Sequence, residues 1–117
     1  MDKKEQLKRM REEKISSKEV YKGIILDIFV DQVRLPSGNT SQREVIRHCH
    51  AAAVLAIDEN NRVLLEDQFR YPYDDIITEI PAGKGDEGED YQITAARELE
   101  EETRYQAGKM EFLGYFY

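Results

Sequence analysis

Residues 83–105 constrain this chain more than any other part of the sequence. They begin as a glycine-rich acidic loop and continue into a stretch of helical periodicity that places three carboxylates on one face. Because an α-helix turns by about 100° per residue, Glu98, Glu101 and Glu102 lie at roughly 140°, 80° and 180° from Ile93. The apolar or small positions lie between about 240° and 360° and are Ile93, Ala96, Leu99 and Thr103. The sequence therefore predicts a helix whose acids lie opposite its core-facing side.

The spacing leaves two interpretations of this acidic face open. Like charges three or four residues apart destabilise a helix by roughly a few tenths of a kcal/mol per pair. A hard divalent cation such as magnesium, bound through oxygen ligands, would remove that repulsion. The alternative is a solvated acidic face, which is the usual meaning of a run of charges.

The same residues resemble the signature of the Nudix hydrolases, G-x5-E-x7-R-E-U-x-E-E-x-G-U, in which U is an aliphatic or bulky apolar residue. The positions that match at the required separations are Gly83, Glu89, Arg97, Glu98, Leu99, Glu101 and Glu102, with Tyr105 a loose match at the last position. One position departs, since Arg104 stands where the signature has its second glycine. A glycine just past a helix usually supplies a left-handed cap, so an arginine there would cost roughly 1 kcal/mol if it adopted a positive φ.

The resemblance implies an α+β protein with the Nudix α/β/α sandwich, built around a mixed sheet. It also implies magnesium or manganese ions, bound by Glu98, Glu101 and Glu102 and by the backbone carbonyl of Ala82. The cations would screen a substrate's charge, orient its diphosphate and acidify a bound water. Arg97 can pair with Glu101 four residues later and hold it in place. The three glutamates and Arg97 are therefore the expected catalytic residues.

Residues upstream of the signature resemble the ADP-ribose pyrophosphatase group of this family. The stretches that carry this likeness are the N-terminal region up to Gly38 and residues 43–48, 51–57, 67–71 and 79–84. The likeness implies hydrolysis of ADP-ribose to AMP and ribose 5-phosphate, with substrate contacts from Arg43, Glu44 and Arg70. Guanidinium groups bind phosphate oxygens in bidentate fashion and stack on adenine, which suits this role. Without the resemblance, each arginine would be interpreted as a surface charge.

The chain is expected to contain three parts. Residues 1–14 are rich in Lys, Arg and Glu and form a frayed helix or a disordered arm. Residues 15–48 form an N-terminal β extension, which by resemblance exchanges between the subunits of a homodimer. Residues 49–117 form the Nudix domain. The expected strands cover 19–35, 40–48, 51–57, 62–69, 76–80 and 110–117, and the expected helix covers 90–103. Gly23 is expected to mark a bulge or bend in the first strand, and residues 40–48 are expected to form an antiparallel hairpin with it.

Two features of the expected Nudix domain bear on its completeness. The continuous apolar run over 51–57 is expected to be a strand buried on both faces. A single helix cannot cover both faces of such a sheet, so the domain is expected to be incomplete at its C-terminus or completed by a partner chain. In this branch the general base often comes from a loop glutamate that would lie beyond Tyr117. Two alternatives therefore stay open: a catalytically inactive nucleotide-binding fragment, and a hydrolase of another nucleoside diphosphate derivative.

Composition restricts the partners and the compartment. The 117 residues carry a formal net charge of −7, which argues against non-specific nucleic-acid binding. The single cysteine, Cys49, excludes an internal disulfide and fits a reducing compartment. No apolar run approaches the roughly 18 residues of a membrane span. The expected location is the cytoplasm.

Two other patterns resemble metal sites and are discounted. The triplet His48-Cys49-His50 has no second cluster to complete a zinc tetrahedron. On a strand, His48 and His50 would share a face and Cys49 would point the other way. An EF-hand loop that started at Asp86 would need an acid at its twelfth position, which is Arg97.

Overall fold

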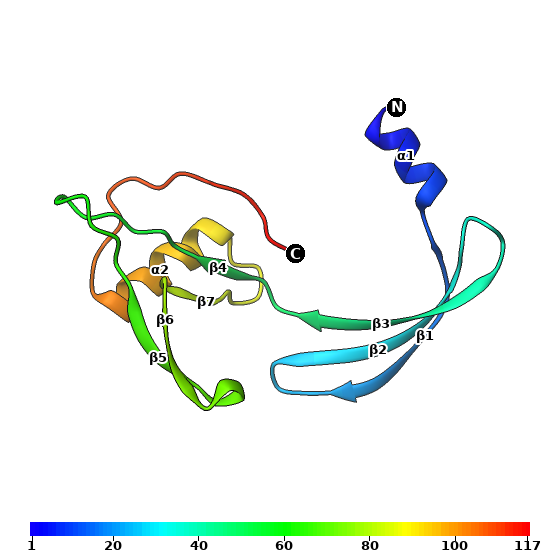
Figure 1. The fold of residues 1–117 in the computed structure, drawn as a ribbon, viewed down its shortest axis with the longest axis horizontal. Helices are drawn as coiled ribbons and strands as arrows, with labels where there is room; N and C mark the ends of the chain where they lie inside the picture. The colour runs from blue at the N-terminus through cyan, green and yellow to red at the C-terminus, as the bar shows by residue number, and fades with distance from the viewer. The chain divides into compact units, whose positions relative to one another are not determined.

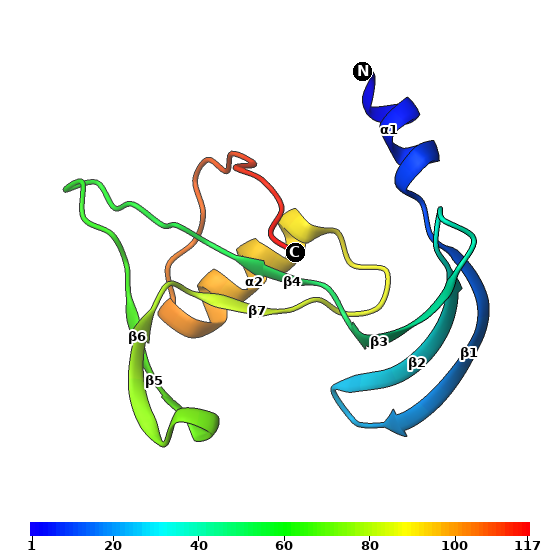
Figure 2. The same cartoon turned by 45° about the vertical axis from the view of Figure 1, so that its right-hand side comes forward.

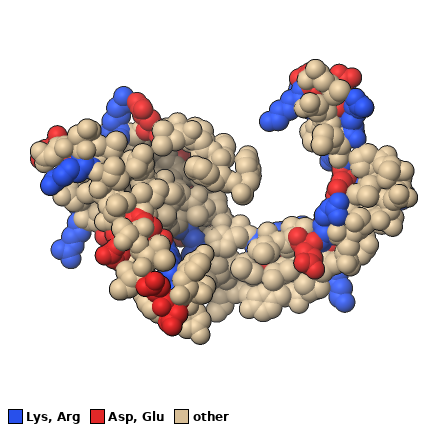
Figure 3. All heavy atoms as spheres, in the orientation of Figure 1, with Lys and Arg blue, Asp and Glu red and all other residues tan.

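The computed structural model describes residues 1–117, which divide into two compact units, Met1–His48 and Cys49–Tyr117 (Figure 1). The chain is of the α+β type that the sequence predicts, with two α-helices and seven strands. No helix combines the length and the apolar character needed to cross a bilayer. On the face shown in Figure 3, positive and negative side chains are interspersed in each unit, so this face presents no continuous basic surface.

The N-terminal unit is a short helix followed by a three-stranded antiparallel sheet (Figure 1). The elements are α1 (Lys3–Met10), β1 (Glu13–Lys22), β2 (Leu26–Arg34) and β3 (Thr40–His48), with the strands in the order β1-β2-β3. At the middle of the sheet, Asp31 lies opposite Ser17 on one side and Arg43 on the other. Asp31 and Val33 are the buried side chains of this unit.

The predicted continuity of the strand over 19–35 is wrong, because these residues contain the end of β1, a turn and β2. The interruption lies at Gly23 as expected, and the antiparallel pairing with 40–48 is confirmed. Gly23 lies in that turn, where its N–H donates to the Leu26 carbonyl at 2.9 Å. β1 begins at Glu13, before the expected start, and every one of its residues is exposed. A strand that is exposed on both faces is held by its backbone ladder and needs no alternation of apolar residues, so the sequence pattern does not mark its start.

The C-terminal unit contains the second helix and two strand pairs. The strands are β4 (Ala51–Ala53), β5 (Glu66–Arg70), β6 (Asp75–Glu79) and β7 (Ala82–Lys84), and a 3-10 turn, η1 (Tyr71–Tyr73), joins β5 to β6. β4 pairs with β7 and β5 pairs with β6, both antiparallel. Helix α2 (Tyr91–Thr103) packs against β4 and β7, and both views show it beside them (Figures 1 and 2). Ala95 and Leu99 form the buried apolar face of α2.

Helix α2 has well-defined ends. Asp90 is its N-cap, and the carboxylate of Asp90 accepts from the Gln92 N–H at 2.9 Å. Arg104 is its C-cap and adopts the left-handed conformation with φ of 64°. The Arg104 N–H closes the last turn on the Glu100 carbonyl at 2.8 Å. The departure from the signature glycine thus places a side chain where glycine is favoured.

Three other strand predictions are corrected. The run 51–57 forms a strand only over Ala51–Ala53, and exposed and half-buried residues alternate along it instead of being buried on both faces. The expected strand over 62–69 begins at Glu66, with Val63 making only an isolated bridge to Ile57. Residues 110–117 form no strand. An apolar segment becomes a strand only when a neighbour completes its backbone hydrogen bonds, and periodicity alone does not reveal that neighbour.

Candidate active site

Strand β7 pairs with β4 along one edge and leaves its other edge to α2. Pro81 and Gly85 flank β7 and bond toward β4. The Pro81 carbonyl accepts from the Val54 N–H at 2.8 Å, and the Gly85 N–H donates to the His50 carbonyl at 2.9 Å. In an antiparallel ladder, alternate residues direct their N–H and C=O groups toward and away from the partner strand. Ala82 and Lys84 therefore direct theirs toward α2.

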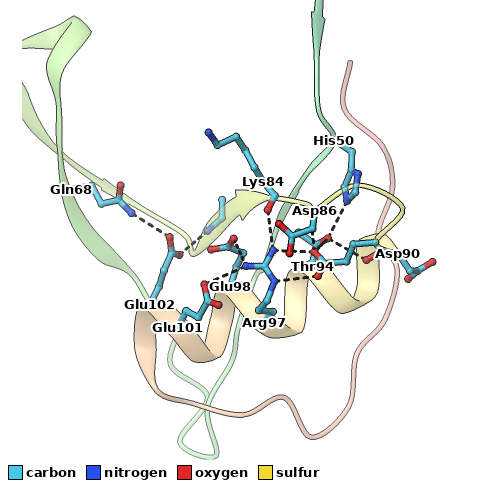
Figure 4. Close-up of polar contacts among 12 residues, drawn as sticks. His50, Gln68, Lys84, Asp86, Asp90, Thr94, Arg97, Glu98, Glu101 and Glu102 are labelled. Carbon is cyan, nitrogen blue, oxygen red and sulfur yellow. Dashed lines mark hydrogen bonds and ion pairs between the residues drawn. The ribbon is translucent and has the colours of Figure 1, made fainter. Parts of the chain in front are cut away.

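Side chains of α2 form hydrogen bonds with the edge of β7 that does not pair with β4 (Figure 4). The Ala82 N–H donates to Glu102 Oε2 at 3.0 Å, and Arg97 Nη2 donates to the Lys84 carbonyl at 3.0 Å. These bonds fix the orientation of the helix against the strand at two points. Because Glu102 lies five residues after Arg97, they also set which α2 side chains face β7.

Arg97 is the centre of an ion-pair network (Figure 4). Its guanidinium donates to both oxygens of Glu89 at 2.9 and 3.2 Å, to Glu98 at 2.9 Å and to Glu101 at 3.2 Å. The hydrogen bond to Glu89 is the main cause that raises the pKa of Arg97. Hydrogen bonds from Arg97 and Thr94 lower the pKa of Glu89 to about 2. Glu89 is therefore ionised at neutral pH and serves as the anchor of Arg97.

Gly83 allows the carboxylate of Glu98 to approach the backbone of β7. A Cβ placed on Gly83 would overlap the carboxyl carbon and both carboxylate oxygens of Glu98. Only 14% of the Glu98 side chain is exposed. Glycine is therefore required at position 83 because the carboxylate of Glu98 lies against its backbone, and not because of a positive φ.

Glu102 lies among other carboxylates. It accepts from Gln68 Nε2 at 3.4 Å, and the same amide donates to Glu66 at 2.6 Å. Burial raises the pKa of Glu102, and the charges of Glu66 and Glu98 add to this shift. Positive charge, from a proton or a cation, is thus favourable at this point.

Sequence reasoning missed Glu66 and Gln68 as neighbours of the site. Along β5, half-buried Glu66, Gln68 and Arg70 alternate with exposed Asp67 and Phe69. That alternation places three polar side chains on the less exposed face of a strand, which is the reverse of the usual pattern. The sequence of β5 carries no clear signal for them, because four of its five residues are polar and the less exposed face is revealed only by the structure.

The donor set of the site fits a divalent cation in its chemistry, although its members are not gathered around one point. The structure places no three acidic, histidine or cysteine side chains close enough to hold one ion together. Glu98 and Glu101 turn toward Arg97, whereas Glu102 turns toward β5 and β7. The available donors are carboxylate oxygens and the Ala82 carbonyl on the same edge, which are the ligands that hard cations prefer.

The three upstream residues predicted to bind substrate fall in different units. Arg43, on β3, donates to both oxygens of Glu12 at 2.9 and 2.5 Å, and this contact raises its pKa. Glu44 is exposed on the same strand. Arg70 belongs to the C-terminal unit, where it pairs with Glu79 across β5 and β6. Each guanidinium therefore already has an anionic partner.

Comparison with known proteins decides the family. The family model of the NUDIX domain matches residues 47–117. This chain belongs to the Nudix family. A second model, the nucleoside diphosphate sugar hydrolase N-terminal domain, matches residues 12–46. The two matches meet beside the boundary between the two compact units.

Curated relatives and a solved structure support the same grouping. The methanol dehydrogenase activator of Bacillus methanolicus is 45% identical over 106 residues, which are 91% of this chain and 57% of that protein. The ADP-ribose pyrophosphatase of Bacillus subtilis (strain 168) is 41% identical over 111 residues, or 95% of this chain and 60% of that protein. The crystal structure of an ADP compounds hydrolase has the same fold, with a TM-score of 0.77 at 19% identity over 89% of this chain and 57% of that one. This Nudix chain thus spans little more than half the length of each of them.

Proposed function

We propose that the protein is a cation-dependent hydrolase that cleaves the pyrophosphate of a nucleoside diphosphate sugar, with ADP-ribose giving AMP and ribose 5-phosphate. One observation carries the proposal: the signature helix places Glu98 on Gly83 and Glu102 on Ala82, along a strand edge with a free carbonyl. The name of the Bacillus subtilis relative supports the choice of substrate.

The residues of the site have two proposed roles: some bind cations, and Arg97 keeps these ligands in position. Glu98, Glu101, Glu102 and the Ala82 carbonyl are the proposed ligands of magnesium or manganese. When bound, such ions screen the diphosphate charge and lower the pKa of a bound water. Arg97 restrains Glu98 and Glu101 through the ion pairs already described. Arg43, Glu44 and Arg70 are the proposed substrate contacts.

When substrate binds, its diphosphate replaces the carboxylates that Arg43 and Arg70 now contact. The pairs Arg43–Glu12 and Arg70–Glu79 both keep more than a quarter of each side chain exposed. Exposed ion pairs contribute little net stability, so a diphosphate can replace the carboxylate at small cost. Guanidinium then binds phosphate in the same bidentate geometry.

We also propose that the protein is a cytoplasmic homodimer that associates through its N-terminal strands. β1 and β3 are the edges of their sheet, and edge strands are templates for pairing with another chain. Large apolar side chains are exposed in and beside these strands, namely Ile15, Val20, Tyr21, Ile24, Ile25 and Ile46. Sedimentation of the protein measures the association directly.

A second candidate is a nucleotide-binding protein without turnover. The observation that favours it is that Arg97 already neutralises Glu98 and Glu101, so two of the three acids have a cationic partner without any metal. Calorimetry that shows ADP-ribose binding with no product would support this candidate. Measurable turnover would exclude it.

The test of the main proposal is product analysis. The protein is incubated with ADP-ribose and magnesium, then manganese, and AMP is quantified. Glu102→Gln removes one proposed ligand, and Glu100→Gln is a matched control because Glu100 is exposed on the same helix. Cation-dependent AMP that Glu102→Gln abolishes and Glu100→Gln spares supports the proposal, whereas equal rates in both variants contradict it.

A further inference from the structure

His50 is tied closely to the start of helix α2. It directly precedes β4, and its ring lies against Gly85, where an added Cβ would overlap the imidazole. The ring also contacts Tyr91, with centroids 4.6 Å apart and planes tilted by 54°. Its Nε2 lies 3.0 Å from Thr94 Oγ1 (Figure 4). The contacts fix the imidazole on more than one side.

The direction of the hydrogen bond between His50 and Thr94 follows from the contact between Thr94 and Glu89. Thr94 Oγ1 lies 2.6 Å from Glu89 Oε1. Glu89 is ionised, so the proton in that short contact must come from the threonine hydroxyl. A hydroxyl has one proton, so the Thr94 oxygen must accept from His50 Nε2–H. The other acceptor near this hydroxyl, the Asp90 carbonyl, is more distant at 3.2 Å.

The bonds form a continuous chain to the centre of the site. His50 donates to Thr94, Thr94 donates to Glu89, and Glu89 accepts from Arg97 with both oxygens. Thr94 has no exposed surface, so water does not reach its hydroxyl to replace the imidazole. Arg97 in turn contacts Glu98 and Glu101.

We propose that His50 is a positioning residue, which donates from Nε2 to Thr94 and thereby holds Glu89 and Arg97 in the geometry that the acids of α2 require. Its effect on catalysis rests on the proposed function, whereas its effect on Arg97 does not. The neutral Nε2–H tautomer and the imidazolium both carry the required proton, so no change of charge on His50 is involved. If His50 served only for packing, an aromatic ring without an N–H would be sufficient at this position.

The first test determines the tautomer by nitrogen-15 NMR of the imidazole. The proposal requires that the neutral ring of His50 carries its proton on Nε2 and has a bare Nδ1. A neutral ring protonated at Nδ1 would overturn it, because Nε2 would then have no proton to donate. This measurement needs no substrate and no substitution.

The second test separates the donor from the ring. His50→Gln keeps an N–H near the position of Nε2 and loses the ring, whereas His50→Phe keeps the ring and its contact with Tyr91 and loses the donor. The readout is the exchange rate of the Arg97 Nε–H with water. We expect exchange to be faster by roughly 2- to 10-fold in His50→Phe, the effect of losing one ordinary hydrogen bond, and near the wild-type rate in His50→Gln.

Turnover of ADP-ribose completes the test. The expected result is a kcat lower by roughly 10-fold in His50→Phe, with KM little changed, and recovery in His50→Gln. If the wild-type protein makes no AMP, the proposed function fails, and the tautomer and the Arg97 exchange still decide the role of His50. Equal Arg97 exchange in the two variants would show that the imidazole only packs.

Discussion

Arg97 and Arg43 both form several hydrogen bonds, but their surroundings differ. Arg97 joins three carboxylates and the Lys84 carbonyl, and 28% of its side chain is exposed. Arg43 has a single carboxylate partner, Glu12, and 43% of its side chain is exposed. A guanidinium anchored at many points fixes its neighbours, whereas an exposed pair exchanges its partner readily. This difference supports the proposal that Arg97 positions its neighbours and that Arg43 contacts substrate.

Gly83→Ala should disrupt the Arg97 region most. The new methyl group would displace the carboxylate of Glu98 from the backbone of β7. We expect cation-dependent turnover to fall by more than about 100-fold, and the free energy of unfolding to fall by roughly 1–3 kcal/mol from overpacking. Denaturant titration and AMP release measure the two effects.

Gly108→Ala is the control for that substitution, because a Cβ at Gly108 meets no atom within 4 Å. It should leave turnover unchanged. Equal losses in the two alanine variants would mean that the contact between Gly83 and Glu98 has no special role.

The same change at the two arginines tests the comparison itself. Arg97→Gln leaves Glu89, Glu98 and Glu101 without their cation, so the urea midpoint should fall clearly. Arg43→Gln should leave that midpoint nearly unchanged and instead raise the KM for ADP-ribose by roughly 10-fold, the loss of about one charge-assisted contact. A larger loss of stability in Arg43→Gln would reverse our assignment of roles.

The pKa of Glu89 predicts how acid affects the Arg97 region. Its folded value of about 2 lies below the ordinary 4.5, so the folded state binds this proton less readily than the unfolded state. The stabilisation is therefore present above about pH 4.5 and is lost as the pH falls from there toward 2. The Glu89→Gln variant should be less stable at neutral pH. Its free energy of unfolding should also change less with pH across that window. An unchanged profile would contradict the ion pair as described.

The smallest expected effect is at the end of α2. Arg104 has a φ of 64°, a conformation that glycine adopts without strain. Arg104→Gly should raise the free energy of unfolding by about 1 kcal/mol and leave Arg97 undisturbed. A loss of stability would mean that the arginine side chain compensates for its backbone.

The extent of the helix was predictable from the sequence, whereas its core-facing side and its contacts with distant segments were not. Ile93, expected on the core-facing side, is 59% exposed, and Glu98, expected opposite it, keeps only 14% of its side chain exposed. The helix extends to Thr103 as expected, and the pair between Arg97 and Glu101 forms because both depend on spacing within one helix. The approach of Gln68 to Glu102 depends on how a hairpin 34 residues earlier in the chain packs, which periodicity does not encode. The segment over 110–117 has strand-like composition but has no ladder partner in the structure. The sequence pattern therefore predicted the signature helix better than the pairing of strands.

We propose above that the acids of α2 and the edge of β7 form a cation site. Titration with manganese, followed by NMR, tests it without any assumption about substrate, because the paramagnetic ion broadens the signals of nearby nuclei. We expect the signals of Ala82, Glu98 and Glu102 to disappear first, while that of Glu12 persists to much higher manganese concentrations. Broadening that begins elsewhere, or that spreads evenly over the acidic surface, would contradict it.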